Sequence, residues 1–120
     1  MVDILIADDS DAIRLVLKEI LSIGEHNVVA EAIDGAEAVD FYQKYKPQLL
    51  MTDLAMPNKD GLQVVKEVLA IDPKAKIIII TASDDKKIIQ ECIDSGASSH
   101  ISKPFIFKDV LASIAKIMEN

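Results

Sequence analysis

Cysteine and long apolar runs are both scarce in this sequence of 120 residues, and each scarcity excludes a class of protein. Cys92 is the only cysteine, so the chain cannot form an internal disulfide, which is typical of a reducing compartment. No apolar run is long enough to cross a bilayer, and Asp3 interrupts the segment where the apolar part of a signal peptide would begin. We therefore expect a cytoplasmic protein with no membrane contact.

An excess of positive charge is also missing. The formal net charge is −7, and the imbalance lies in residues 1–60, where twelve acids face five bases, whereas residues 61–120 hold eight of each. Surfaces that bind nucleic acid are normally basic, so we expect no nucleic-acid partner. The surplus of acids in the first half is compatible with a cation site, although solvated helix faces produce the same charge pattern.

What the sequence does contain is a regular alternation of two hydrophobic patterns. Short apolar runs typical of buried strands occupy residues 2–7, 28–32, 49–52 and 77–80, and residues 98–102 are expected to form a fifth, short strand. Apolar residues at helical spacing mark residues 13–21, 38–45, 62–69, 89–93 and 107–118, with Ser83 and Asp84 as the expected cap of the fourth helix. Strands joined through helices in this way must be parallel, with right-handed crossovers. The pattern therefore predicts an α/β fold with a five-stranded parallel sheet.

Polar side chains suited to one reaction follow four of the predicted strands. They are Asp8 and Asp9 after the first strand, Asp53 at the end of the third, Thr81 after the fourth and Lys103 after the fifth. Parallel strands bring their carboxyl ends to one edge, so we expect these groups to share a crevice. Three carboxylates repel one another unless a cation is present, and oxygen ligands without histidine or cysteine favour Mg²⁺ or Mn²⁺. A carboxylate can attack phosphorus, and phosphoryl transfer requires a metal, a second cation and a hydroxyl.

Each of these residues also has a structural explanation. Asp8 and Asp9 can simply cap the following helix, Thr81 is an ordinary residue at a strand end, and a single lysine such as Lys103 is usually solvated. Asp53 follows a continuous apolar run, which disfavours an exposed loop position. It is the combination of the groups at one predicted edge that favours a site.

The same residues, taken in order, resemble a known family. The motifs are Asp8-Asp9, the D-x-x-M-P-x-x-x-G pattern of residues 53–61, Thr81-Ala82, Gly96-Ala97 and Lys103-Pro104-Phe105. Together they resemble the response-regulator receiver domain of two-component signalling, and most closely the stand-alone chemotaxis type. The resemblance covers essentially the whole chain. It implies a flavodoxin-like, doubly wound (βα)5 fold with sheet order 2-1-3-4-5, two helices on one face and three on the other, formed by residues 1–120 as a single domain without an attached output domain.

The resemblance also implies a phosphoacceptor and a metal site. Asp53 would accept a phosphoryl group from a sensor histidine kinase or a histidine phosphotransfer protein. Mg²⁺, with Mn²⁺ as a possible substitute, would be ligated by Asp9, Asp53 and the carbonyl of Ala55, while Asp8 would act mainly through water. The chain would then be a phosphoprotein whose product is a signal, so we do not expect a metabolic enzyme.

Further roles implied by the resemblance concern the response to phosphorylation. Lys103 would bind the phosphoryl group, with a cis peptide bond to Pro104, and Thr81 would turn inward to meet the same group. The family usually has Tyr or Phe three residues before this lysine, as a switch that rotates on activation, whereas this chain has His100. We expect a monomer that presents its fourth helix, fifth strand and fifth helix to a downstream protein.

The chemotaxis role has three alternatives: a phosphorelay intermediate, a phosphatase and a flavin-binding module. The chain could be a chemotaxis messenger or an intermediate in a phosphorelay, and the sequence does not separate these two. A phosphatase with an aspartyl nucleophile typically needs a second acid two residues on, where this chain has Ala55. A flavin-binding module needs a phosphate cradle after the first strand, where Asp8 and Asp9 would repel a phosphate.

Overall fold

Five strands and five helices alternate along the computed structural model, which describes residues 1–82 and 86–119. The strands are β1 (Asp3–Ala7), β2 (Asn27–Ala32), β3 (Leu49–Asp53), β4 (Ile77–Thr81) and β5 (Ser99–Ser102). The helices are α1 (Asp11–Ile23), α2 (Gly35–Tyr45), α3 (Gly61–Ile71), α4 (Lys86–Asp94) and α5 (Phe107–Met118). The predicted alternation is confirmed, and the expected cap of the fourth helix at Ser83 and Asp84 lies outside the described residues.

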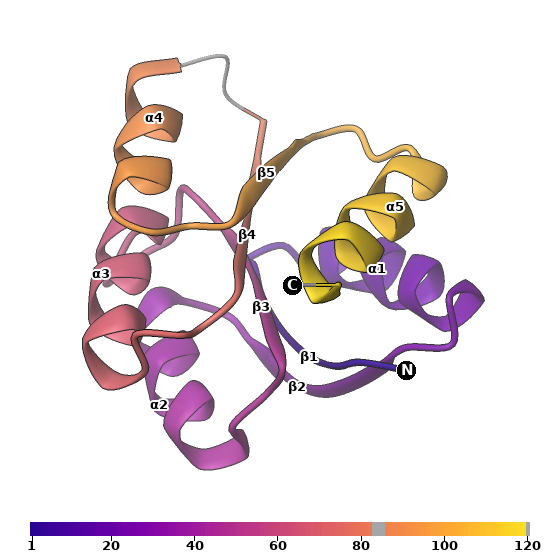
Figure 1. Ribbon diagram of the computed structural model, residues 1–120, viewed down its shortest axis with the longest axis horizontal. Helices are drawn as coiled ribbons and strands as arrows, with labels where there is room; N and C mark the ends of the chain where they lie inside the picture. Colours follow the sequence, from indigo (N-terminus) through magenta and orange to yellow (C-terminus); the bar gives the residue numbers. More distant parts are fainter. Residues whose placement is uncertain (83–85, 120) are drawn as a thin grey trace.

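The strands form one parallel sheet in the order β2-β1-β3-β4-β5, as expected. Helices α1 and α5 cover one face of this sheet, and α2, α3 and α4 cover the other (Figure 1). The register brings the carboxyl ends of the inner strands level with one another, through the pairs Ala7–Thr52, Asp53–Ile80 and Thr81–Ser102. Groups that follow these ends in the sequence are therefore delivered to one edge of the sheet.

Strands β3 and β4 lie inside the sheet, and their position accounts for their unbroken apolar runs. Every residue of β3 and β4 is buried, because helices cover both faces of the sheet. Alternate side chains enter different clusters: Ile77 and Ile79 pack on the side of α2, α3 and α4, while Ile78 and Ile80 pack on the side of α1 and α5. Apolar packing on both faces of the sheet therefore holds β3 and β4 in place.

The buried face of α1 differs from the prediction. Val16 was expected on the apolar stripe but is 42% exposed, and Arg14 is buried in its place. Tyr45 on α2 and Phe107 on α5 were also expected on apolar faces and are exposed. Leu17 and Leu21 are buried as predicted, so the helix and most of its buried face are confirmed, and the difference is confined to Val16 and Arg14.

The loop between β3 and α3 folds tightly against the end of β3. The N–H of Gly61 donates to the carbonyl of Leu54 at 2.7 Å, and a Cβ at Gly61 would lie 2.6 Å from the carbonyl oxygen of Asp53. Only glycine fits this close approach. Asp60 caps α3 by accepting a hydrogen bond from the N–H of Gln63 at 2.9 Å. The segment that follows Asp53 is therefore held in a fixed position.

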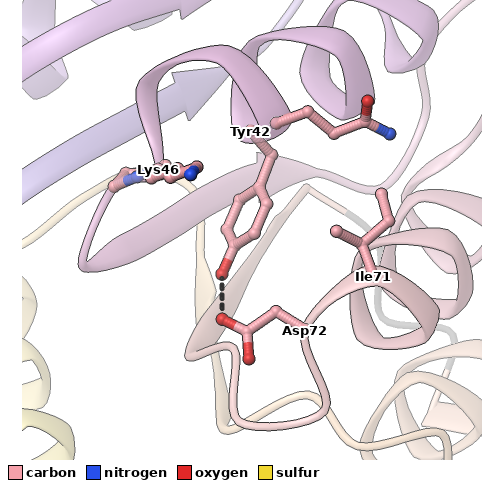
Figure 2. Close-up of a pocket in the computed structure, with 6 residues that line it drawn as sticks. Tyr42, Lys46, Ile71 and Asp72 are labelled. Atoms are coloured by element: carbon pink, nitrogen blue, oxygen red, sulfur yellow. Dashed lines mark hydrogen bonds between the residues drawn. The ribbon is translucent and has the colours of Figure 1, made fainter.

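A cavity of about 480 Å³ lies at the opposite edge of the sheet, where β3 and β4 begin. Its lining comes from the ends of α2 and α3 and from the residues that follow them: Tyr42, Gln43, Lys46, Pro47, Ile71 and Asp72. Figure 2 shows Tyr42 reaching from α2 to Asp72, and its hydroxyl donates to Asp72 Oδ2 at 3.1 Å. This bond ties the end of α2 to the end of α3.

Within the described part of the chain, no helix is both long enough and apolar enough to cross a membrane.

Candidate functional site

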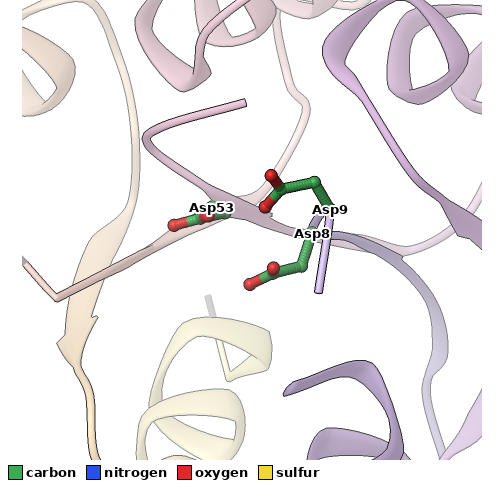
Figure 3. Close-up of side chains that lie close together, drawn as sticks. All are labelled: Asp8, Asp9 and Asp53. Carbon is green, nitrogen blue, oxygen red and sulfur yellow. The ribbon is translucent and has the colours of Figure 1, made fainter. Parts of the chain in front are cut away.

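Three carboxylates meet at the carboxyl edge of the sheet. Asp8 and Asp9 follow β1, and Asp53 is the last residue of the neighbouring strand β3. One carboxylate oxygen from each lies within 4.8 Å of the others, and Figure 3 shows the three side chains gathered around one space. Asp8 and Asp53 are buried, whereas Asp9 is exposed. The predicted grouping of the three acids is therefore present.

Lys103 is the cation that faces this cluster. Its Nζ lies 3.1 Å from Asp8 Oδ2 and 3.5 Å from Asp53 Oδ1, so one ammonium group bridges two buried carboxylates. The Lys103–Pro104 peptide bond is cis, as the resemblance to receiver domains implied. The backbone N–H of Lys103 donates to the carbonyl of Thr81 at 2.8 Å, which joins the ends of β4 and β5.

The protonation of Asp53 reflects a conflict between its neighbours. Burial and the charge of Asp8 raise the pKa of Asp53, while Lys103 and the N–H of Leu54 act in the opposite direction. The net shift is upward. The N–H of Leu54 donates to Asp53 Oδ1 at 2.9 Å, which fixes the rotation of the carboxylate. The site thus holds an oriented carboxylate in surroundings that resist its negative charge.

A cavity of about 340 Å³ opens beside these groups. Its lining residues are Asp53, Leu54, Ala55, Thr81, Ala82 and Lys103. Thr81 is buried at the end of β4, and Ala55 is exposed at the rim. This one cavity is therefore lined by the predicted residues Asp53, Ala55 and Thr81 together with Lys103. The cavity is large enough for a small tetrahedral group.

His100 lies away from this cavity. It belongs to the edge strand β5 and is exposed. It lines a separate hollow of about 300 Å³ together with residues of β5 and α5, among them Asp109. An edge strand leaves one side of the sheet open, and this accounts for the exposure.

The donor set fits a hard divalent cation. The three carboxylates offer oxygen atoms alone, which Mg²⁺ prefers. The buried Oδ2 of Asp8 accepts no hydrogen bond from the described residues, although Lys103 lies nearby. A buried carboxylate oxygen without such a bond is costly, and a cation ligated nearby would lower that cost.

The sequence analysis missed one residue next to this site. Arg14 of α1 is buried, and its Nη1 donates to the backbone carbonyl of Asp8 at 2.6 Å. A charged residue one turn before Leu17 on the apolar stripe of the helix was the available signal, since arginine is rarely buried without partners.

Comparison with known proteins identifies the class. The family of response regulator receiver domains matches residues 4–115 of the chain. The chain therefore belongs to this family, as the resemblance of its motifs predicted.

Individual relatives span nearly the whole chain. The chain is 39% identical to the chemotaxis protein CheY of Bacillus subtilis (strain 168) over 115 residues, which are 96% of each chain. It is 37% identical to protein CcdB of the same organism over 118 residues, 98% of each chain. Among solved structures, it is similar to one in the CheX-CheY-BeF3-Mg complex from Borrelia burgdorferi, with a TM-score of 0.93 and 28% identity over 97% of this chain and 88% of that one.

These findings place the chain among the receiver domains of two-component signalling, related to chemotaxis proteins. The alternative of an aspartyl phosphatase is not supported. Receiver domains bind Mg²⁺ at an acidic pocket and interact with kinases and downstream proteins, and this chain carries a cluster of three acids, Asp8, Asp9 and Asp53, whose oxygen atoms could hold a metal ion.

Proposed function

We propose that this receiver domain accepts one phosphoryl group on Asp53 from a phosphohistidine of a sensor histidine kinase or a histidine phosphotransfer protein. The observation that carries the proposal is the bridged arrangement: Asp53 ends a buried strand, lies in the acidic cluster and faces Lys103. A carboxylate Oδ of Asp53 attacks phosphorus, and the P–N bond to the donor imidazole breaks. The leaving imidazole takes up a proton as it departs, and Asp53 becomes an acyl phosphate.

The surrounding residues stabilise the charge that develops on the phosphoryl oxygens. Lys103 can move from its ion pairs with Asp8 and Asp53 to a phosphoryl oxygen, and Thr81 can donate its hydroxyl to another. Loss of the phosphoryl group follows by attack of water on phosphorus, which releases inorganic phosphate and a proton and restores the Asp53 carboxylate. This limited chemistry makes the chain a signalling protein and not a metabolic enzyme.

The cation has a defined place in the proposal. Asp9, Asp53 and the carbonyl of Ala55 would hold Mg²⁺ directly, and Asp8 would act through a water molecule. A bound divalent cation neutralises the acidic cluster and the incoming phosphoryl oxygens. Mn²⁺ has similar ligand preferences and should substitute for it.

Similarity to chemotaxis proteins supports the signalling role. We propose a cytoplasmic, monomeric messenger of the chemotaxis type, formed as a single receiver domain by residues 1–120. Its α4–β5–α5 surface would contact a downstream protein after Thr81 and His100 respond to the phosphoryl group. The overall similarity to CheY favours this role over that of a phosphorelay intermediate.

Intact mass spectrometry tests the phosphoacceptor directly. Incubation with acetyl phosphate and Mg²⁺ should add the mass of one phosphoryl group to the protein. Asp53→Asn should abolish the addition, because an amide is a poor nucleophile toward phosphorus. Asp40→Asn is the matched control, since it makes the same change on the exposed face of α2 and should leave the addition intact. A full mass gain in Asp53→Asn would refute the assignment, and removal of Mg²⁺ with EDTA should suppress the gain in the unmodified protein.

A further inference from the structure

The guanidinium of Arg14 is buried next to the acidic cluster and binds three acceptors. Nη1 donates to the carbonyl of Asp8 at 2.6 Å, Nε donates to Glu31 Oε1 at 3.1 Å, and Nη2 pairs with Asp11. Arg14 is 8% exposed, so these contacts replace most of its contact with water. Burial acts to lower the pKa of Arg14, but its acidic partners outweigh this effect, and the group stays charged.

The bond to the Asp8 carbonyl orients the peptide unit that joins Asp8 to Asp9. This unit contains the backbone nitrogen of Asp9, so its orientation sets the direction in which the Asp9 side chain leaves the backbone. The Asp8 carboxylate has its own supports, because Oδ1 accepts from the N–H of Ser10 at 2.9 Å and Oδ2 faces Lys103. The Asp9 carboxylate is exposed and has no hydrogen-bond or ion-pair partner within residues 1–82 and 86–119. Its position therefore depends on the backbone that Arg14 holds.

Glu31 fixes Arg14 from the other side. It lies on β2, and its second oxygen accepts from Lys18 Nζ at 3.0 Å. Lys18 and Arg14 thus share one anchor on the sheet, but the contacts of Lys18 do not extend to the β1–α1 loop. The chain contains two cations in one network, of which one touches the loop that carries Asp9 and one does not.

We propose that Arg14 is a positioning residue for the divalent cation: it holds the Asp8–Asp9 peptide so that Asp9 joins Asp53 in one ligand set. The inference rests on the proposed function, because it assumes that the acidic cluster binds Mg²⁺. Arg14 contacts the backbone and not the carboxylates of the cluster, so it acts through Asp9.

Charge and position make opposite predictions for this residue. A guanidinium near the site repels a divalent cation, so charge alone predicts that Arg14→Met strengthens Mg²⁺ binding. The positioning role predicts weaker binding. Arg14→Lys separates the two effects further, because it keeps the charge while a single ammonium cannot reproduce the planar fork that reaches Asp8 and Glu31 together.

The test compares Mg²⁺ dissociation constants, measured by isothermal titration calorimetry, for the unmodified protein, Arg14→Met, Arg14→Lys and Lys18→Met. Both Arg14 variants should bind Mg²⁺ about tenfold more weakly, which is the usual effect of losing a group that orients a metal ligand. Lys18→Met, the matched control, should stay within about twofold or bind slightly more tightly. Unchanged or tighter binding in Arg14→Met, or binding by Arg14→Lys equal to that of the unmodified protein, would overturn the role.

A second measurement separates positioning from general damage to the fold. The rate of phosphorylation by acetyl phosphate is followed against Mg²⁺ concentration, and the half-saturating concentration should rise about tenfold while the maximum rate at saturating Mg²⁺ stays within about twofold. A maximum rate that falls about tenfold, with no change in the half-saturating Mg²⁺ concentration, would contradict the proposal. If Arg14→Met does not fold, Glu31→Gln takes its place: it removes the charged anchor and should weaken Mg²⁺ binding about threefold, and unchanged affinity would overturn the proposal.

The two proposals fail differently. An unmodified protein that binds no Mg²⁺ refutes the metal site and the role of Arg14 together. An unmodified protein that binds Mg²⁺ beside Arg14 variants of equal affinity refutes the role of Arg14 alone.

Discussion

The two edges of the sheet each carry a cavity, and the two cavities differ more in charge than in size. The cavity at the start of β3 and β4 has a volume of about 480 Å³, and the one at the ends of these strands about 340 Å³. At the first edge Tyr42 and Asp72 are paired: the Tyr42 hydroxyl donates to Asp72 Oδ2 at 3.1 Å, and the N–H of Lys74 donates to Asp72 Oδ1 at 3.0 Å. Burial together with Asp72 raises the pKa of Tyr42 to about 12, so its hydroxyl stays neutral.

The second edge, where β3 and β4 end, holds more negative than positive charge, and we call it the charged edge. Asp8, Asp9 and Asp53 crowd together against one ammonium group, and burial with the charge of Asp8 raises the pKa of Asp53. Free space is thus a poor guide to function in this protein. Unrelieved charge is a better one, because a ligand that neutralises the acids would lower the free energy of the folded state.

The largest expected effect comes from removing the ammonium group at the charged edge. Lys103→Met should destabilise the protein by about 3 kcal/mol near neutral pH, because the buried carboxylates of Asp8 and Asp53 would then lose the ammonium group that faces them both. The loss should shrink on acidification. The folded-state pKa of Asp53 lies above its ordinary value, so the folded protein takes up a proton more readily than the unfolded chain as the pH falls.

Urea unfolding at neutral and acidic pH measures this effect. Lys108→Met is the matched control, since Lys108 is exposed on α5, and it should change the free energy of unfolding by less than about 0.5 kcal/mol. Equal destabilisation by Lys103→Met at both pH values would mean that the carboxylates of the charged edge are not under strain.

The second prediction concerns the exposed acid of the cluster. Asp9→Ala should weaken Mg²⁺ binding by at least about tenfold, because it removes one of the three carboxylates. In the absence of Mg²⁺ the same variant should be as stable as the unmodified protein or more stable, by less than about 1 kcal/mol, because one repelling charge is lost from an exposed position. Calorimetric titration with Mg²⁺ and thermal melting measure the two effects. An unchanged Mg²⁺ affinity would remove Asp9 from the site.

The third prediction concerns the edge where β3 and β4 begin, where a substitution should change stability and leave Mg²⁺ binding unchanged. Tyr42→Phe should lower the free energy of unfolding by about 1 kcal/mol, the contribution of one hydrogen bond, and should not change Mg²⁺ affinity. Tyr45→Phe is its control, because Tyr45 is 43% exposed and its hydroxyl makes no hydrogen bond within the described residues. Urea unfolding of both variants with and without Mg²⁺ checks the prediction. A Mg²⁺ affinity altered by Tyr42→Phe would show that the two edges communicate.

The sequence predicted the fold and the grouping of the acids because both depend on short-range patterns. A continuous apolar run such as that of β4 needs cover on two faces, and helices between strands force parallel pairing. Once pairing is parallel, the residue after each run lies at the same edge. Asp8, Asp53 and Thr81 could therefore be placed near one another without any knowledge of contacts.

The burial of Arg14 on α1 could not be predicted, because long-range contacts decide it. Val16 and Arg14 both border the apolar stripe of the helix, and helical spacing alone favours the valine. The carbonyl of Asp8 and the carboxylate of Glu31, which is seventeen residues away, turn Arg14 inward. The residue with the closest contact to the acidic loop was for this reason absent from the sequence prediction.

The smallest prediction concerns His26, which lies just before β2. The N–H of Val2 donates to His26 Nδ1 at 3.2 Å, so the ring must be unprotonated at this atom to keep the bond. Burial and the positive charge of the N-terminal amine lower the pKa of His26. The unfolded chain therefore binds a proton more readily, and the contribution to stability is complete above the ordinary histidine pKa and is lost as the pH falls below it.

The expected loss is less than about 1 kcal/mol between about pH 7.5 and about pH 5.5, since it corresponds to one hydrogen bond. The raised pKa of Asp53 adds its own response to acidification, so the informative quantity is a difference between proteins. His26→Gln cannot be protonated and can still accept from Val2, so its free energy of unfolding should fall less on acidification than that of the unmodified protein. His100→Gln removes an exposed histidine from β5 and leaves the bond between Val2 and His26 in place, so it should follow the unmodified protein. If His26→Gln and His100→Gln lose the same stability on acidification, the bond to Val2 does not link protonation to folding, and the pH response belongs to the acids of the charged edge.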